Sequence, residues 1–575
     1  MKRRLLLLVL AAALRGAVPP PPVASGPVVE LPPMLVEAAG TSAPRWLYGR
    51  MPGFEILSCA SSDATEDLTL RLYRLRAQLA QLVPASLQVQ RDEPFTLILY
   101  PQNRAESLSQ ALNEQLAIGQ NRQLARGRAL APPNLTLADP DSIELFLIVN
   151  DRPAAATWNS RGVFTGGGRY DGIVFSEGYI RSLLQDRAPA TPPWFVDGLS
   201  QFYTTLATTE DGMEFSPDPW LGPEWASAAR REGADAFRPT LPLSELFRGQ
   251  RPAAPVDAVS RAHFDLWLAE AELFVRWAID GSSHRNYQSR AALWQFAEAA
   301  ARAPVTEATF RQCFGMGYSD ARDEMSDYLA RAVVRPVTVD LGPEPSIPDL
   351  RLRMAAPSEI HRIKGDWARR TLRLVRESHP ALLPIYVRQA REVLQSAYDA
   401  GERDPRLVAN LGLLYSESGS PEQASRYLLE GSETGGIRAA ALAQLARLRL
   451  LPFLEPARQE LGRPNPAEVA SVMGAVRAAH RLQPPQLLTY LVVARLCELD
   501  PGRATAEERA LLAEGADLFP SWTALVLSAV REDAAYGDRA RARRLAEMGL
   551  WTGTDPVLIA RLKSERNALL AKPTK

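Results

Sequence analysis

The sequence has little of what usually identifies a chemistry at once. Its 575 residues include only three cysteines and five histidines. The cysteines, Cys59, Cys313 and Cys497, are far apart and odd in number, which argues against a disulfide framework. Lone thiols are therefore expected, with a Cys59–Cys313 bridge as the alternative.

Neither sign of charge is in surplus. Lysine plus arginine and aspartate plus glutamate both number 66, so the formal net charge is zero. A general nucleic-acid binder needs an excess of basic side chains to neutralise phosphates. The balance of charges therefore predicts no nucleic-acid partner.

Long hydrophobic runs are also missing. The apolar run Leu5–Leu14 follows Lys2, Arg3 and Arg4. As a helix it would span about 15 Å, against about 30 Å of bilayer core. A basic start followed by a short apolar run is typical of a cleaved secretory signal. We therefore predict a signal peptide over residues 1–25, export to the periplasm or the extracellular space, and no transmembrane span after cleavage.

What the sequence does contain is a change of pattern near its middle. A proline-rich linker, residues 26–43, leads into residues 44–335, where buried-strand patterns alternate with helical ones. Strands are predicted at Phe95–Tyr100 and Ile143–Val149, with a shorter one at Gly172–Phe175. This front half is expected to be α+β, with a small mixed sheet and a helical lobe.

The rear half carries an internal repeat. Residues 336–348 contain four prolines and are predicted to link the two halves. In residues 349–575, small and apolar residues recur 34 positions apart, as Ala390 and Leu394 do at Ala424 and Leu428. Small residues let paired helices approach closely, and large ones fill the groove between successive pairs.

That spacing, with Leu411, Gly412 and Tyr415 between the repeated positions, resembles the tetratricopeptide repeat. The resemblance implies an all-α solenoid of helix pairs whose surface binds a protein or peptide partner. A generic helical bundle is the alternative.

A second pattern lies in the front half, within Val174–Leu206. Trp194, Asp197, Gly198 and Leu199 form the sequence W-x-x-D-G-L. This pattern resembles the second active-site helix of the gluzincin peptidases, in particular the bacterial peptidase-MA-like group. In that family the helix opens W-x-x-E-G-L, and its glutamate is the third zinc ligand. Asp197 stands at that position, one methylene shorter.

The first active-site helix of that family carries HExxH, whose two histidines bind zinc and whose glutamate is the general base. Here Ser176-Glu177-Gly178-Tyr179-Ile180 stands in its place, so both histidines are replaced and only Glu177 is kept. The resemblance, which spans residues 44–335, therefore implies a zincin-like domain that has lost its metal site. We expect no metal and no cofactor.

The same residues allow two alternatives to an emptied site. Glu177 and Asp197 could still bind zinc together with His263 or His284. They could also act as an acid and a base across a cleft, as paired carboxylates do in glycoside hydrolysis. Otherwise Asp197 would simply pair with a nearby arginine, such as Arg181.

Aromatic side chains cluster beside Asp197. Trp194, Phe195, Phe202 and Tyr203 recur at helical spacing. They could line a binding groove for an extended peptide or a sugar, although packing in the core is the commoner role of such a cluster.

The sequence therefore predicts an exported, non-catalytic binding or scaffolding protein, a pseudoenzyme whose helical repeats dock the partner. The alternative is a peptidase or glycosidase-like hydrolase that is still active through Glu177 and Asp197. A front half that only supports the repeats is a third alternative.

Overall fold

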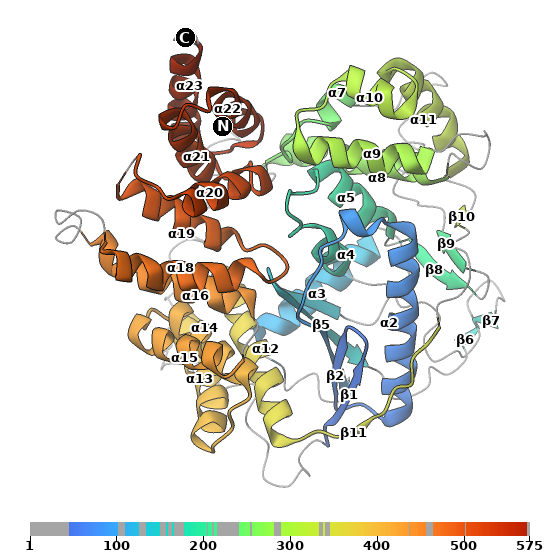
Figure 1. The fold of residues 1–575 in the computed structure, drawn as a ribbon. Helices are drawn as coiled ribbons and strands as arrows, with labels where there is room; N and C mark the ends of the chain where they lie inside the picture. The colour runs from blue at the N-terminus through green and yellow to red at the C-terminus, as the bar shows by residue number, and fades with distance from the viewer. Residues whose placement is uncertain are drawn as a thin grey trace, which may run out of the picture.

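The computed structural model describes residues 45–101, 108, 110–125, 134–149, 157–158, 164–165, 177–203, 205–209, 212–215, 241–253, 256–280, 289–332, 337–339, 346–435, 438–455, 464–500 and 502–571. The predicted signal peptide, the proline-rich linker, the predicted strand Gly172–Phe175, Ser176 and His284 lie outside these residues. The front half contains a mixed sheet with helices around it, and the rear half is almost entirely helical (Figure 1).

The main sheet has six strands in the order β11-β1-β2-β3-β5-β4. Strands β1 (Leu47–Met51) and β2 (Phe54–Ser58) form a hairpin. Its turn places Gly53 at a φ of 74°, in the left-handed region that favours glycine. Strands β3 (Phe95–Pro101) and β5 (Ser142–Val149) continue the sheet parallel to β2. The two clearest predicted strands are therefore confirmed.

The edges of the sheet are antiparallel. Strand β4 (Asn134–Asp139) pairs with β5, and β11 (Arg353–Met354) pairs with β1. Two small sheets lie outside the main one. They are formed by β6 (Thr157–Trp158) with β7 (Phe164–Thr165), and by β8 (Leu206–Thr209), β9 (Gly212–Phe215) and β10 (Val337–Val339).

Helices cover both faces of the main sheet. One face packs against α2 (Ser62–Leu82), α4 (Glu177–Leu184) and α5 (Pro193–Tyr203), which share a single hydrophobic core with it. The other face packs against α3 (Gln110–Ala125) and α12 (Pro357–Ser378). Because both faces are covered, the central strands are mostly apolar and do not alternate with polar residues.

A helical lobe completes the front half and packs on α5 (Figure 1). Its helices are α7 (Leu243–Leu246), α8 (Ala258–Asp280), α9 (Ser289–Arg302), α10 (Glu307–Phe314) and α11 (Tyr318–Ala332). Aromatic rings from four of these segments meet in its core, including Phe247, Phe274, Phe296 and Phe310.

The rear half is a stack of helices that runs beside the front half from α13 to α23 (Figure 1). Its helices are α13 (Leu383–Asp399), α14 (Pro405–Glu417), α15 (Pro421–Glu433), α16 (Ala439–Leu450), α18 (Pro466–His480), α19 (Leu487–Glu498), α20 (Ala506–Leu518), α21 (Thr523–Ala535), α22 (Arg539–Thr552) and α23 (Pro556–Ala571). A Cβ atom on Gly412 would lie 2.7 Å from Cγ of Leu428, so α14 and α15 approach too closely for a larger residue. Among the described residues, no helix is long and apolar enough to cross a membrane.

The boundary between the halves differs from the predicted linker. Val337–Val339, inside the predicted linker, form β10 and pair with β9. Beyond the linker, β11 extends the main sheet, and Trp367 of α12 packs on it with its ring centroid 4.6 Å from that of Phe146. The front sheet is therefore completed by residues that the sequence analysis assigned to the rear half.

Buried charges hold the two halves together at this boundary. Arg438, directly before α16, places Nη2 2.7 Å from Oδ2 of Asp139, the last residue of β4, and 2.9 Å from Oδ1 of Asp141, in the turn after it. Its Nη1 lies 3.4 Å from Oδ2 of Asp366 on α12. Since a buried charge without a partner is costly, these side chains fix how the rear helices sit on the sheet.

The network continues along α12. Arg370 Nη2 lies 2.8 Å from Oδ2 of Asp366, and Arg369 pairs with both Asp366 and Asp139. Further along, Arg362 Nη1 donates to Oε2 of Glu55 on β2 at 3.0 Å. The interface is thus built from side chains that lie hundreds of residues apart in the sequence.

All three cysteines are among the described residues, and none of them forms a disulfide bond. Cys59 follows β2, and Cys313 lies on α10 in the helical lobe. The alternative of a Cys59–Cys313 bridge is therefore wrong for this structure.

Candidate functional site

The W-x-x-D-G-L pattern lies in the buried helix α5, which is packed between α4 and α8. Gly198 explains part of the pattern, because a Cβ atom there would lie 2.4 Å from the carbonyl oxygen of Ala271 on α8. Only glycine allows the two helices to approach this closely. Asp197, the residue before it, is 1% exposed.

Two arginines neutralise Asp197. Its Oδ1 accepts a hydrogen bond from Nη1 of Arg181, one turn from the end of α4. Its Oδ2 lies 2.9 Å from Nε of Arg251, in the segment after α7. The predicted pairing with Arg181 is confirmed. Both carboxylate oxygens therefore lie within ion-pair distance of a guanidinium group, although Oδ2 and Arg251 are not in hydrogen-bond geometry.

The first helix of the predicted site begins with Glu177, 20 residues before Asp197. The side chain of Glu177 and all of Ser176 lie outside the described part of the structure. Ile180, which stands where the second histidine of HExxH would be, is buried in the core. The acid–base pair of Glu177 and Asp197 stays a prediction.

No metal centre is assembled by the residues that the structure describes: no three His, Cys, Asp or Glu side chains there are grouped to hold an ion. His263, the described histidine of the alternative zinc site, lies on the first turns of α8. Its Nε2 is 3.7 Å from Oε1 of Glu245, and it lines the same cavity as Arg251.

The four aromatic residues of α5 do not line a groove. Trp194, Phe195, Phe202 and Tyr203 are all buried. The ring of Trp194 meets that of Phe247 at a centroid distance of 5.2 Å, so the aromatic core of the helical lobe covers it. The prediction of a ligand groove on these residues is contradicted by their burial. They are apolar because both sides of α5 pack against other elements.

Two cavities reach the surface instead. The smaller one measures about 420 Å³ and lies where the helical lobe meets α22. The larger one measures about 700 Å³ and lies between the edge of the main sheet and the rear helices. Both volumes fall in the range of about 300–1,000 Å³ that is common for ligand pockets.

The larger cavity is apolar on its rear wall. That wall is formed by side chains of α14, α16, α19 and the α20–α21 turn: Leu413, Ala440, Ala443, Leu487, Leu488, Leu491, Phe519 and Trp522. Trp522 is 49% exposed, which is unusual for so large an apolar side chain.

Its charged residues differ in their accessibility. Glu417 and Asp186 are 35% and 29% exposed at the side chain. Arg369 and Arg187 on the same cavity are 2% and 7% exposed, and both are held in ion pairs. The two acids are therefore the more accessible charges of the cavity, although each is also ion-paired, Glu417 with Arg369 and Asp186 with Arg91.

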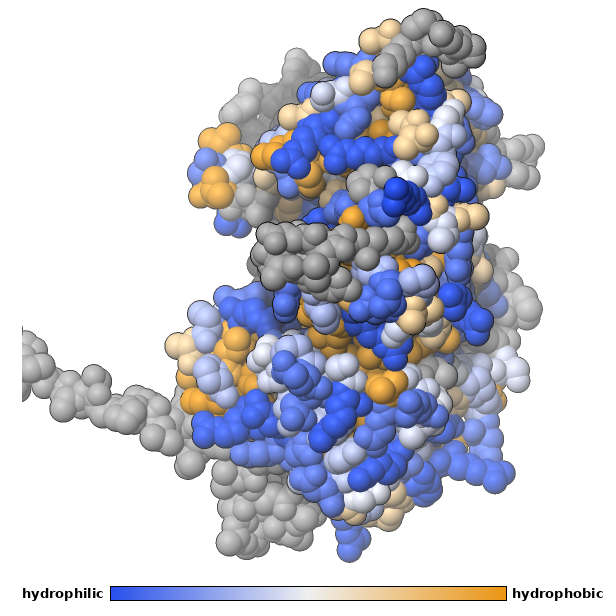
Figure 2. Space-filling view, turned by 60° about the vertical axis from the view of Figure 1, so that its left-hand side comes forward, coloured by the Kyte–Doolittle hydropathy of each residue, from blue (hydrophilic) through white to orange (hydrophobic). Residues whose placement is uncertain are grey.

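On the face that Figure 2 shows, the apolar side chains of the described residues do not form one large area. Hydrophilic side chains dominate there, and the hydrophobic ones form small, scattered patches. Scattered apolar residues are normal on a folded protein. The cavities are therefore the better candidates for binding sites.

No protein-family model and no curated protein matches the sequence. The function must therefore be argued from the residues of the site itself. Sequence reasoning found Asp197 and Arg181. It missed Arg251, which belongs to no sequence pattern. It also missed both cavities, because their walls combine segments that lie far apart in the sequence.

Proposed function

We propose that the protein is an exported, non-catalytic binding protein. Its front half is a zincin-like domain whose metal site has been replaced by ion pairs. Its rear half is a solenoid of tetratricopeptide-like helix pairs that docks an extended segment of a partner protein.

The pairing of Asp197 carries the first part of this proposal. A zinc ligand or a general acid needs a carboxylate oxygen that is free to reach the metal or the substrate. In Asp197, Oδ1 accepts a hydrogen bond from Arg181, and Oδ2 lies at ion-pair distance from Arg251. The positive charge that a zinc ion would supply to this carboxylate comes instead from two guanidinium groups.

Metal analysis tests this part. The untagged full chain is incubated with zinc, desalted and analysed by mass spectrometry for bound metal. We expect far less than one zinc ion per chain, and the same low value in Asp197→Asn and Glu177→Gln. One zinc ion per chain that is lost in either variant would show that the site is still a metal centre.

A hydrolysis assay addresses the alternative of an active hydrolase. Protein and glycoside substrates are incubated with the full chain and with Glu177→Gln. We expect no turnover above the level of the variant. Turnover that disappears in Glu177→Gln would replace the binding proposal with a catalytic one.

The larger cavity supports the second part. Its rear wall offers apolar side chains to an extended segment. Its more accessible acids, Glu417 and Asp186, are paired with Arg369 and Arg91, and a basic residue of that segment would share these carboxylates. We infer that the partner inserts a segment with apolar side chains and at least one lysine or arginine.

A co-purification experiment tests this docking. The full chain is used as bait on an envelope extract, beside Trp522→Glu and Val557→Glu. Both residues are exposed and apolar, but only Trp522 lines the cavity. A partner that binds stoichiometrically should be lost with Trp522→Glu and kept with Val557→Glu. Equal binding by all three proteins would place the docking surface elsewhere.

A further inference from the structure

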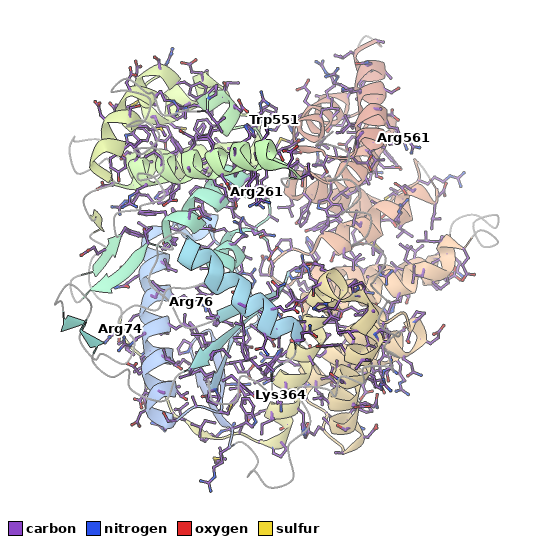
Figure 3. The ribbon with its side chains drawn as sticks, turned by 180° about the vertical axis from the view of Figure 1, so that it is seen from behind. Arg74, Arg76, Arg261, Lys364, Trp551 and Arg561 are labelled. Atoms are coloured by element: carbon purple, nitrogen blue, oxygen red, sulfur yellow. The ribbon has the colours of Figure 1, made fainter. Side chains whose placement is uncertain are left out.

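The smaller cavity lies at a junction between distant parts of the chain. Its floor comes from Arg248, Gln250 and Arg251, which follow α7, and one wall comes from His263 and Trp267 of α8. The opposite wall is Trp551, from α22 near the end of the chain. Figure 3 shows Trp551 close to the end of α8 where Arg261 is labelled.

Contact between the two halves closes this cavity. A Cβ atom on Gly249 would lie 2.5 Å from Nε1 of Trp551, so the indole rests directly on the backbone of the segment after α7. Beside it, Nε2 of Gln250 donates a hydrogen bond to the carbonyl oxygen of Gly553 at 2.7 Å. The cavity is therefore formed only when α22 sits on the helical lobe.

The lining is rich in positive charge. Two arginines, Arg248 and Arg251, face the cavity, while Glu245 is the one carboxylate among the described residues that line it. Arg248 is exposed and makes no ion pair within the part of the chain that the structure describes. Arg251 is 45% exposed although its Nε is directed at Asp197.

We propose that this cavity binds a carboxylate attached to a flat apolar group, as at the end of a peptide chain with an aromatic last residue. The planar guanidinium of an arginine matches the two oxygens of a carboxylate. The rings of Trp267 and Trp551 supply apolar walls for the attached group. This cavity shares no lining residue with the larger one, so the test of carboxylate binding is independent of the test of partner docking.

Calorimetric titration of the full chain tests the proposal. N-acetylphenylalanine is compared with N-acetylphenylalaninamide, which has the same ring and no charge. We expect saturable binding of one acid molecule per chain and at least about tenfold weaker binding of the amide, since hydrogen bonds to charged groups are the stronger ones. Equal binding of the two probes, or no binding of either, would overturn the proposal.

Two arginine variants locate the site. Arg248→Gln should weaken binding of the acid about tenfold or more, because it removes a charge-assisted contact. Arg261→Gln is the matched control, as Arg261 is an exposed arginine on α8 outside the cavity lining. Equal effects of the two variants would mean a diffuse charge effect and would contradict a defined site.

A third comparison separates the two sources of such a carboxylate. A tripeptide ending in phenylalanine with a free carboxylate is titrated beside N-acetylphenylalanine. If the tripeptide binds about tenfold more tightly, the site extends along a peptide chain and the ligand is a protein C-terminus. If the two bind alike, the ligand is a small free carboxylic acid. Either result supports carboxylate recognition.

Discussion

Replacing Arg438 with methionine should strongly destabilise the protein. Asp141, 1% exposed, pairs with Arg438 and with no other arginine among the described residues. In Arg438→Met it would keep only the backbone N–H of Ala440, at 3.0 Å, and the hydroxyl of Ser142, at 3.2 Å. Removing one member of a buried ion pair leaves the other charge without compensation and costs about 3–5 kcal/mol.

A double variant separates the lost pairing from lost packing. Asp141→Asn removes the charge that Arg438→Met leaves behind, while methionine retains much of the length of the arginine side chain. The double variant should therefore be at least about 1 kcal/mol more stable than Arg438→Met alone.

The free energy of unfolding of each full-length variant is measured by urea denaturation, followed both by circular dichroism and by tryptophan fluorescence. Arg373→Met is the matched control, because Arg373 lies on α12 but is 76% exposed, and its pairing with Glu377 should be worth less than about 1 kcal/mol. If Arg438→Met destabilises no more than Arg373→Met, the buried charges do not hold the halves together and the reasoning is refuted.

Further predictions concern packing and pH. Trp367→Ala should cost about 3–5 kcal/mol, measured in the same urea assay, because it empties a buried site between α12 and the sheet. Gly198→Ala should cost about 1–3 kcal/mol through overpacking against α8, whereas Gly474→Ala, in open space on α18, should stabilise the protein by about 0.5–1 kcal/mol. Burial raises the pKa of Glu144 to about 8. The protonated side chain therefore stabilises the folded state fully below about pH 4.5, and this stabilisation is lost as the pH rises through about 8. The free energy of unfolding should fall by up to about 1.4 kcal/mol per pH unit in this range. Glu144→Gln should flatten this decline in urea titrations across that range. Burial disfavours the charge of Asp366, but the adjacent arginines outweigh this effect and lower its pKa. The ionised side chain therefore stabilises the folded state above about pH 4, and this stabilisation is lost in acid. Glu144→Gln should leave that acid-dependent loss unchanged.

Local sequence patterns predicted strands β3 and β5 of the sheet but not the hairpin of β1 and β2. Strands β3 and β5 are mostly apolar, with Glu144 as their one charged residue, so their burial is visible in the sequence. The hairpin of β1 and β2 contains Arg50 and Glu55, and charged residues argue against a buried strand. Glu55 is tolerated there because Arg362 pairs with it from 307 residues away. No local pattern reveals such a partner.

The candidate site shows the same limit. Arg181 lies 16 residues from Asp197, so their pairing could be anticipated. Arg251 lies 54 residues beyond Asp197 and belongs to no periodic pattern. For the aromatic residues of α5, the sequence favoured the core but left a groove as an alternative. The contact of Phe247 with Trp194, from the distant helical lobe, decides that Trp194 is core.

The contacts between the halves bear on where binding takes place. Buried ion pairs join the start of the rear stack to the sheet, and Trp551 joins its far end to the helical lobe. Between them, Oδ2 of Asp92 accepts a hydrogen bond from the backbone N–H of Gln483 at 2.7 Å. The larger cavity lies between these contacts, and residues of both halves form its walls. A rear half expressed alone would expose the charges of α12 and Arg438 and would lose the front wall of the cavity. The docking surface is therefore a property of the whole chain, and a fragment that fails to bind would say nothing against it.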